Sequence, residues 1–87
     1  MNQQTIANTT PARSLHVIGR EILVDWKKPY FGAVPYLSAL ADLETIEGSY
    51  GDDSARSIVR YFLSNATTWR GEVARRIKAE LNLMVKG

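Results

Sequence analysis

The chain has 87 residues, 45% of them hydrophobic and 23% charged, and this length and balance predict one soluble domain with one modest core. It contains no cysteine, which excludes disulfide bonds, thiolate metal sites and cysteine nucleophiles. The net charge of +2 hides a separation: residues 1–53 hold four basic and seven acidic residues, whereas residues 54–87 hold seven basic and two acidic residues.

Residues 1–9 are mostly Asn, Gln and Thr, with Ile6 as the one large apolar side chain after the initiating residue. This composition predicts a disordered tail, followed by a single helical domain over residues 10–87. The start of the chain lacks the basic residues and the apolar run of a signal peptide, and no stretch of about 18 apolar residues follows. We therefore expect a cytoplasmic protein.

The first helix is predicted from about residue 10 to Trp26, with Thr10 as its N-cap and Pro11 at its first position. Gly19 inside this helix predicts that another helix crosses closely there. Apolar residues recur at the spacing of three and four that lines one helical face, widened by two valines: Leu15, Ile18, Ile22, Leu23 and Trp26, with Val17 and Val24.

Residues 29–35 contain two prolines, a glycine and two aromatic residues, a composition that predicts an ordered corner. A second helix is predicted from about Val34 or Pro35 to residue 47, with Gly48 as a left-handed C-terminal cap. The sequence leaves open whether the aromatic residues between Tyr30 and Tyr36 fill the core or form an interface.

The third helix is predicted to begin at Asp52 or Asp53, either of which suits an N-cap, and to end before a break at residues 65–68. Its expected buried face is Ala55, Ile58, Val59, Phe62, Leu63 and Ala66. Thr68 is the predicted N-cap of a fourth helix from Trp69 to about Val85. The expected buried stripe of this helix is Trp69, Val73, Ile77, Leu81 and Met84 or Val85.

No segment shows strand alternation of convincing length, and no internal repeat is present. The pattern predicts an all-α protein: a compact bundle of four short helices, with a flexible N-terminal tail, in which sequential helices are neighbours. Up-down and orthogonal packings both fit, and the proline corner favours a non-parallel arrangement. The overall look is similar to that of many short, cysteine-free helical proteins of bacteria and their phages.

The residues that usually carry chemistry are few. His16 is the only histidine, and a lone histidine beside apolar neighbours is more typical of a half-exposed structural residue than of a catalytic base. Glu21 and Asp25 are four residues apart, but no calcium-loop spacing accompanies them. Phosphate-binding glycine loops and a nucleophile elbow are also absent from the sequence. We expect no enzyme, no cofactor, no metal, no small-molecule substrate and no membrane binding.

The basic half carries the one pattern with functional content, because arginines are enriched at protein interfaces and also contact phosphates. The residues predicted to bind a partner are Arg56, Arg60, Arg70, Arg75, Arg76, Lys78 and Tyr61. The expected function is a non-enzymatic protein-interaction module. Self-association as a dimer is one form of it, since a dimer buries more apolar surface per chain. The alternative is a small DNA- or RNA-binding protein that uses the basic face of the third and fourth helices.

Overall fold

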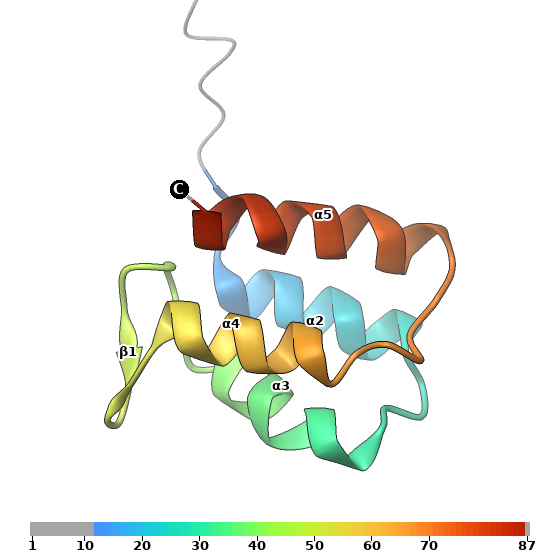
Figure 1. Cartoon of the computed structure of the whole chain (residues 1–87), viewed down its shortest axis with the longest axis horizontal. Helices are drawn as coiled ribbons and strands as arrows, with labels where there is room; N and C mark the ends of the chain where they lie inside the picture. Colours follow the sequence, from blue (N-terminus) through green and yellow to red (C-terminus); the bar gives the residue numbers. More distant parts are fainter. Residues whose placement is uncertain (1–11, 87) are drawn as a thin grey trace, which may run out of the picture.

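The computed structural model describes residues 12–86 (Figure 1). Its elements in chain order are α2 (Leu15–Asp25), the short 3-10 helix η1 (Phe31–Ala33), α3 (Val34–Leu40), β1 (Ser49–Tyr50), β2 (Asp53–Ser54), α4 (Ala55–Ser64) and α5 (Glu72–Lys86). The predicted tail over residues 1–9, and Thr10 and Pro11, lie outside the described residues. The prediction that the first helix begins near residue 10 is wrong, because residues 12–14 are not helical and α2 begins after an extended Ser14. A mostly helical fold is confirmed, and the small sheet was not predicted.

The helices pack in a closed ring, in which each contacts the next along the chain and α5 returns to α2. In Figure 1, α3 and α5 lie on opposite sides of the pair formed by α2 and α4, and the chain direction alternates from helix to helix. This connectivity is that of an up-down bundle, with α3 inclined to the other helices. None of the helices within residues 12–86 combines the length and the apolar character needed to cross a membrane.

Three aromatic rings form the centre of one end of the core. Trp26 and Trp69 stack with ring centroids 5.8 Å apart, and Phe62 of α4 meets both of them edge-on. The Trp69 indole N–H donates to Asp25 Oδ2 at 2.8 Å, which satisfies the polar edge of this largely buried ring. The cluster therefore holds the end of α2 and the α4–α5 connection at the same end of the bundle.

Gly19 is the point where α3 crosses α2. A Cβ built at this glycine would lie 3.3 Å from Cβ of Leu40, which confirms the predicted close crossing. The prediction that Val17, Leu23 and Val24 share the buried face is wrong, because all three are exposed. Only α3 and α5 pack extensively on α2, and they leave these flanks open.

The second helix is shorter than predicted, since α3 ends at Leu40 and the chain then turns. The main-chain oxygens of Leu43 and Glu44 accept from the N–H groups of His16 and Leu15, both at 2.9 Å. The first N–H groups of a helix have no partner within that helix, so this segment supplies partners for the start of α2. In the predicted helix to residue 47, the oxygens of Leu43 and Glu44 would instead accept from the N–H groups of residues 47 and 48.

A β-hairpin precedes α4 and changes the expected N-cap. Ser49 pairs with Ser54, and Gly51 in the turn has a φ of 62°, a left-handed conformation that favours glycine. Ser54 is the N-cap, because its Oγ accepts from the N–H of Ser57 at 3.0 Å. The prediction of an aspartate cap is wrong, since Asp52 and Asp53 belong to the hairpin. Gly48 likewise caps no helix, because it leads into the hairpin.

The fourth helix begins at Glu72, not at Trp69, so Thr68 is not its N-cap. The stacking of Trp69 on Trp26 holds this residue in the connecting segment, and the chain then turns at Gly71, whose φ is 112°. The buried residues of α5 are Ala74, Ile77 and Leu81, while Val73, Met84 and Val85 are partly buried. The predicted buried face of α4 is confirmed, with Leu63 partly buried at its edge.

Candidate interaction surfaces

Two of the predicted partner-binding residues, Arg56 and Arg60 of α4, point at the end of α5. Nη1 of Arg56 donates to the main-chain oxygens of Met84 and Val85 at 3.0 and 3.1 Å, and Nη2 of Arg60 donates to that of Val85 at 3.4 Å. The last carbonyls of a helix lack internal donors and carry the negative end of its dipole. Both guanidinium groups therefore stabilise the contact between α4 and α5.

Arg76 belongs to an ion-pair network between α2 and α5. Its guanidinium contacts Glu21, which also pairs with Arg13 at 2.8 Å, and Arg13 pairs in turn with Glu80 at 2.7 Å. The hydrogen bond from Arg13, followed by that from Arg76, lowers the pKa of Glu21 below its usual value. Within residues 12–86, the salt bridge of Arg76 is to Glu21 of the neighbouring helix and not to Glu72 or Glu80, which lie four residues away on its own helix.

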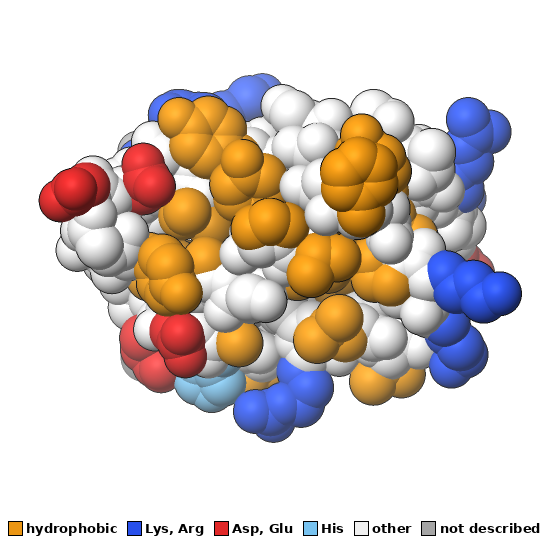
Figure 2. Space-filling model, turned by 90° about the horizontal axis from the view of Figure 1, so that it is seen from below, with side chains coloured by type: hydrophobic (Ala, Val, Ile, Leu, Met, Phe, Trp, Pro, Cys, Tyr) orange, Lys and Arg blue, Asp and Glu red, His pale blue; other side chains and the backbone are white. Residues whose placement is uncertain are grey.

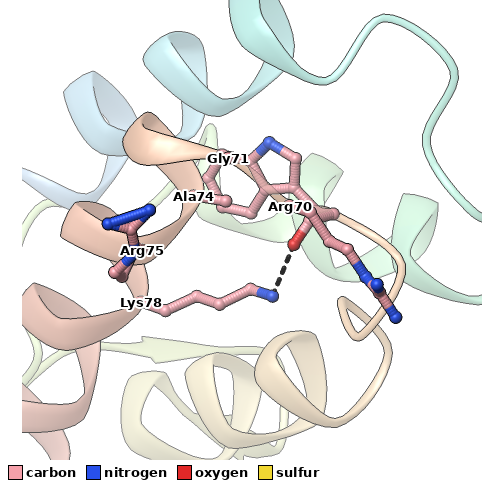
Figure 3. Close-up of a pocket in the computed structure, with 6 residues that line it drawn as sticks. Arg70, Gly71, Ala74, Arg75 and Lys78 are labelled. Atoms are coloured by element: carbon pink, nitrogen blue, oxygen red, sulfur yellow. Dashed lines mark hydrogen bonds between the residues drawn. The ribbon is translucent and has the colours of Figure 1, made fainter.

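The remaining cations of the predicted basic face surround a shallow pocket of about 270 Å³ at the start of α5. Figure 3 shows the side chains of Arg70 and Arg75 on opposite sides of the Lys78 ammonium group. Lys78 Nζ donates to the main-chain oxygen of Trp69 at 2.6 Å, and burial, followed by the charge of Arg70, lowers the pKa of Lys78. Neither arginine forms a salt bridge with any residue from 12 to 86, so both side chains are available to an anion.

Tyr61 lies apart from these cations, against α3. Its ring centroid is 5.4 Å from that of Tyr36, and the rings of Tyr30 and Phe31 form a second pair at 4.8 Å. All of these side chains except the half-buried Tyr36 are exposed, as is Val34 at the start of α3. We call Tyr30, Phe31, Val34, Tyr36 and Tyr61 the aromatic surface.

The helical turn that carries this surface has an unusual composition. The thirteen residues from Pro29 to Ala41 include no charged side chain. The inner side of η1 and α3 is buried in the core, but the outer side is open to solvent, and Phe31 is 79% exposed. The exposed outer positions, at the spacing of a helical face, are Phe31, Val34, Pro35 and Ser38. A helix that is hydrophobic on all sides is normally buried on all sides. The outer face of this uncharged helix is instead exposed, with no other segment from residues 12–86 packed on it.

Gly32 determines how the two rings of the corner are arranged. A Cβ at this position would lie 2.6 Å from the Tyr30 ring and 2.8 Å from Oδ1 of Asn65. The absence of a side chain therefore lets Tyr30 fold back over the corner toward the end of α4, while Phe31 is left in solvent.

Figure 2 shows the molecule from the side on which α3 is outermost. Hydrophobic side chains extend across the middle of this face, acidic side chains gather at one end, and basic side chains lie at the other end and along both long edges. Protein interfaces commonly combine an apolar centre that includes aromatic residues with a charged rim. The face has this arrangement.

The side chains of His16, Glu21 and Asp25 contact other residues within the fold. His16 is half-buried, as predicted, with Nδ1 3.2 Å from Glu44. Glu21 is held in the ion-pair network and Asp25 accepts from Trp69, so the two carboxylates are engaged by different partners. In the part of the chain that the structure describes, no three side chains of the metal-binding types gather into one site.

Sequence reasoning selected Tyr61, left open whether the aromatic residues from Tyr30 to Tyr36 are core or interface, and missed Val34. The sequence feature that could have indicated this surface is the uncharged run at residues 29–41. A segment of this length with only one buried side does not need to lack charge on every side. Comparison of the chain with protein family models, with curated proteins and with solved structures finds no match. The description of the molecule therefore rests on its geometry: it is a small helical bundle with an uncharged aromatic surface on one side and a basic pocket at one end.

Proposed function

We propose that this protein is a non-enzymatic protein-interaction module that binds its partner through the aromatic surface. The observation that carries the proposal is the exposure of an uncharged helical face, with Phe31 79% exposed at its edge. Tyrosine and other aromatic side chains provide much of the binding energy at protein interfaces. The pairing of Tyr36 with Tyr61 already orders two of these rings, which reduces the entropy lost on binding.

The proposal is tested by comparing which proteins are captured from an extract of the source organism by the wild-type chain and by Phe31→Ser. The matched control is Leu83→Ser, because Leu83 is 71% exposed on α5, on the side of the bundle opposite α3. Both substitutions remove an exposed apolar side chain, and circular dichroism verifies that both variants are folded.

We expect at least one protein to be retained by the wild type and by Leu83→Ser and lost by Phe31→Ser. An identical set of captured proteins for all three chains would contradict the role of the aromatic surface. Loss with Leu83→Ser alone would instead place the interface on α5.

The pocket at the start of α5 favours a second candidate, in which Arg70, Arg75 and Lys78 contact the phosphates of DNA or RNA. It retains three of the six cations of the predicted basic face, together with the pocket between them. The test is fluorescence anisotropy with labelled duplex and single-stranded oligonucleotides at two salt concentrations. Binding that weakens steeply with salt is expected, because phosphate contacts release counterions.

The informative variant for this candidate is Arg70→Ala combined with Arg75→Ala. Its matched control combines Arg20→Ala with Lys86→Ala, which removes the same charge from exposed positions elsewhere. Equal weakening by both double variants would indicate attraction by net charge only, and absence of binding at low salt would reject the candidate.

A further inference from the structure

We infer that the partner of the aromatic surface is a second copy of this chain, bound about a two-fold axis that sets the two α3 helices antiparallel. The inference rests on the proposed function, since it names the occupant of the same surface. It is argued from two gradients along that face, one of charge and one of side-chain size, which the same arrangement satisfies.

The first gradient is one of charge. Lys27 and Lys28 directly precede the uncharged run at residues 29–41, and Asp42 and Glu44 directly follow it. All four side chains are exposed. Because η1 and α3 lead from one end of the face to the other, these four residues make it positive where the helix begins and negative where it ends. Figure 2 shows further basic side chains along both long edges of the face.

Neighbouring segments strengthen both ends. The stack of Trp26 on Trp69 brings the residues that follow them, Lys27 and Arg70, to the same end of the bundle. The hairpin, which has Asp52 in its turn and Asp53 in β2, lies at the opposite end in Figure 1. The charge separation therefore belongs to the tertiary structure as well as to the order of residues along the chain.

The second gradient is one of size. Along residues 30–41, the large side chains of Tyr30 and Phe31 stand at the basic end, whereas the exposed positions near the acidic end are the small residues Ser38 and Ala41. Beyond them, Tyr50 of the hairpin is the large side chain that is exposed at the acidic end. In an antiparallel pair, Phe31 of each copy covers Ser38 and Ala41 of the other. In a parallel pair, Phe31 would meet Phe31 and would leave the small residues uncovered.

The same antiparallel pair places the basic end of each copy against the acidic end of the other. A two-fold axis forms every such contact twice and closes the assembly at two copies, so neither copy keeps an unpaired interface that could bind a third chain. A parallel pair would bring like charges together, which opposes association. Charge and size thus select the same geometry independently.

The first experiment is sedimentation equilibrium over a range of protein concentrations. We expect the wild-type chain to dimerise reversibly and Phe31→Ser to weaken the dimer by about a hundredfold, as loss of a large aromatic contact at an interface does. Ser38→Arg inserts a large cation where Phe31 of the other copy is placed, and it is expected to be monomeric. The control Leu83→Ser is expected to dimerise like the wild type.

A charge exchange tests the antiparallel geometry itself. At low salt, Lys28→Glu alone and Asp42→Lys alone each place like charges opposite each other and should weaken the dimer by about tenfold. The double variant restores opposite charges across the axis, so it is expected to recover most of the lost affinity. The antiparallel geometry would be overturned if neither single variant changed the affinity of the dimer. It would also be overturned if the double variant dimerised more weakly than both single variants.

A wild-type chain that stays monomeric at every concentration would overturn the inference of a second copy. The proposed function would then still be decided by the capture comparison of Phe31→Ser with Leu83→Ser, which does not require self-association. A dimer that survives Phe31→Ser but is lost with Leu83→Ser would place self-association on α5 and overturn the inference in a different way.

Discussion

Nη1 of Arg56 lies 3.0 Å from the main-chain oxygen of Met84, so a side chain near the start of α4 supplies a donor to the end of α5. The same guanidinium contacts the Glu47 carboxylate through Nη2 at 3.2 Å. One residue therefore joins α4, the end of α5 and the segment before the hairpin. An arginine in this position contributes to stability whatever else it binds.

Replacing Arg56 tests this structural role. We expect Arg56→Ala to lower the free energy of unfolding by about 1 to 2 kcal/mol, because it removes charge-assisted hydrogen bonds to helix-terminal carbonyls. Arg75→Ala, which removes an exposed arginine from the same pair of helices, should change it by less than about 0.5 kcal/mol. Urea denaturation measures both, and equal effects would show that the contact to Met84 contributes nothing.

The Glu21 network predicts a loss of stability in acid. The pKa of Glu21 is lower in the folded protein than in the unfolded chain, chiefly because Arg13 and then Arg76 donate to its carboxylate. Its contribution is therefore fully present above the ordinary glutamate pKa of about 4.3 and is lost as the pH falls through the folded value.

Glu21→Gln should consequently lower stability at neutral pH by about 1 kcal/mol and should make the acid-induced loss of stability shallower. Asp52→Asn, at an exposed turn position, should alter neither quantity appreciably. Denaturant unfolding at a series of pH values separates the two variants. If the free energy of unfolding fell equally steeply with falling pH in Glu21→Gln and in the wild type, the acid-induced loss would not come from Glu21.

The crossing of α2 and α3 at Gly19 predicts a strong effect of bulk. Gly19→Val places methyl groups beyond a Cβ that is already 3.3 Å from Leu40, and it should destabilise the fold by about 2 kcal/mol through overpacking. Arg20→Val introduces the same side chain at the next, exposed position and should cost only a few tenths of a kcal/mol. Thermal unfolding of the two variants would show similar midpoints if the close crossing were absent.

The N-cap of α4 distinguishes the structure from the sequence-based prediction. Ser54→Ala should cost about 1 kcal/mol, because the N–H of Ser57 loses the hydroxyl that accepts from it. Asp53→Ala should cost clearly less, since its residue lies one position before the cap, in the hairpin. If Asp53→Ala lowered the free energy of unfolding in urea by more than Ser54→Ala does, Asp53 and not Ser54 would be the N-cap.

Much of the helical core could be predicted from local pattern alone. Ile58, Val59 and Phe62 recur at helical spacing, and this periodicity determines which side of α4 is buried whatever packs against it. Gly19 likewise indicated a close crossing before its partner was known. The candidate site was predicted less well, because only Tyr61 of the aromatic surface had been selected.

Local pattern is thus enough to identify the helical class, the separation of acidic and basic halves and the uncharged run at residues 29–41. The tertiary structure alone decided that α3 stops at Leu40, that Arg56 and Arg76 are engaged by neighbouring helices and that Phe31 faces solvent. The physical reason is that periodicity is a property of neighbours along the chain. The partner of a carbonyl or a guanidinium group, and the cover over an aromatic ring, come instead from residues far away in sequence, which only packing brings together.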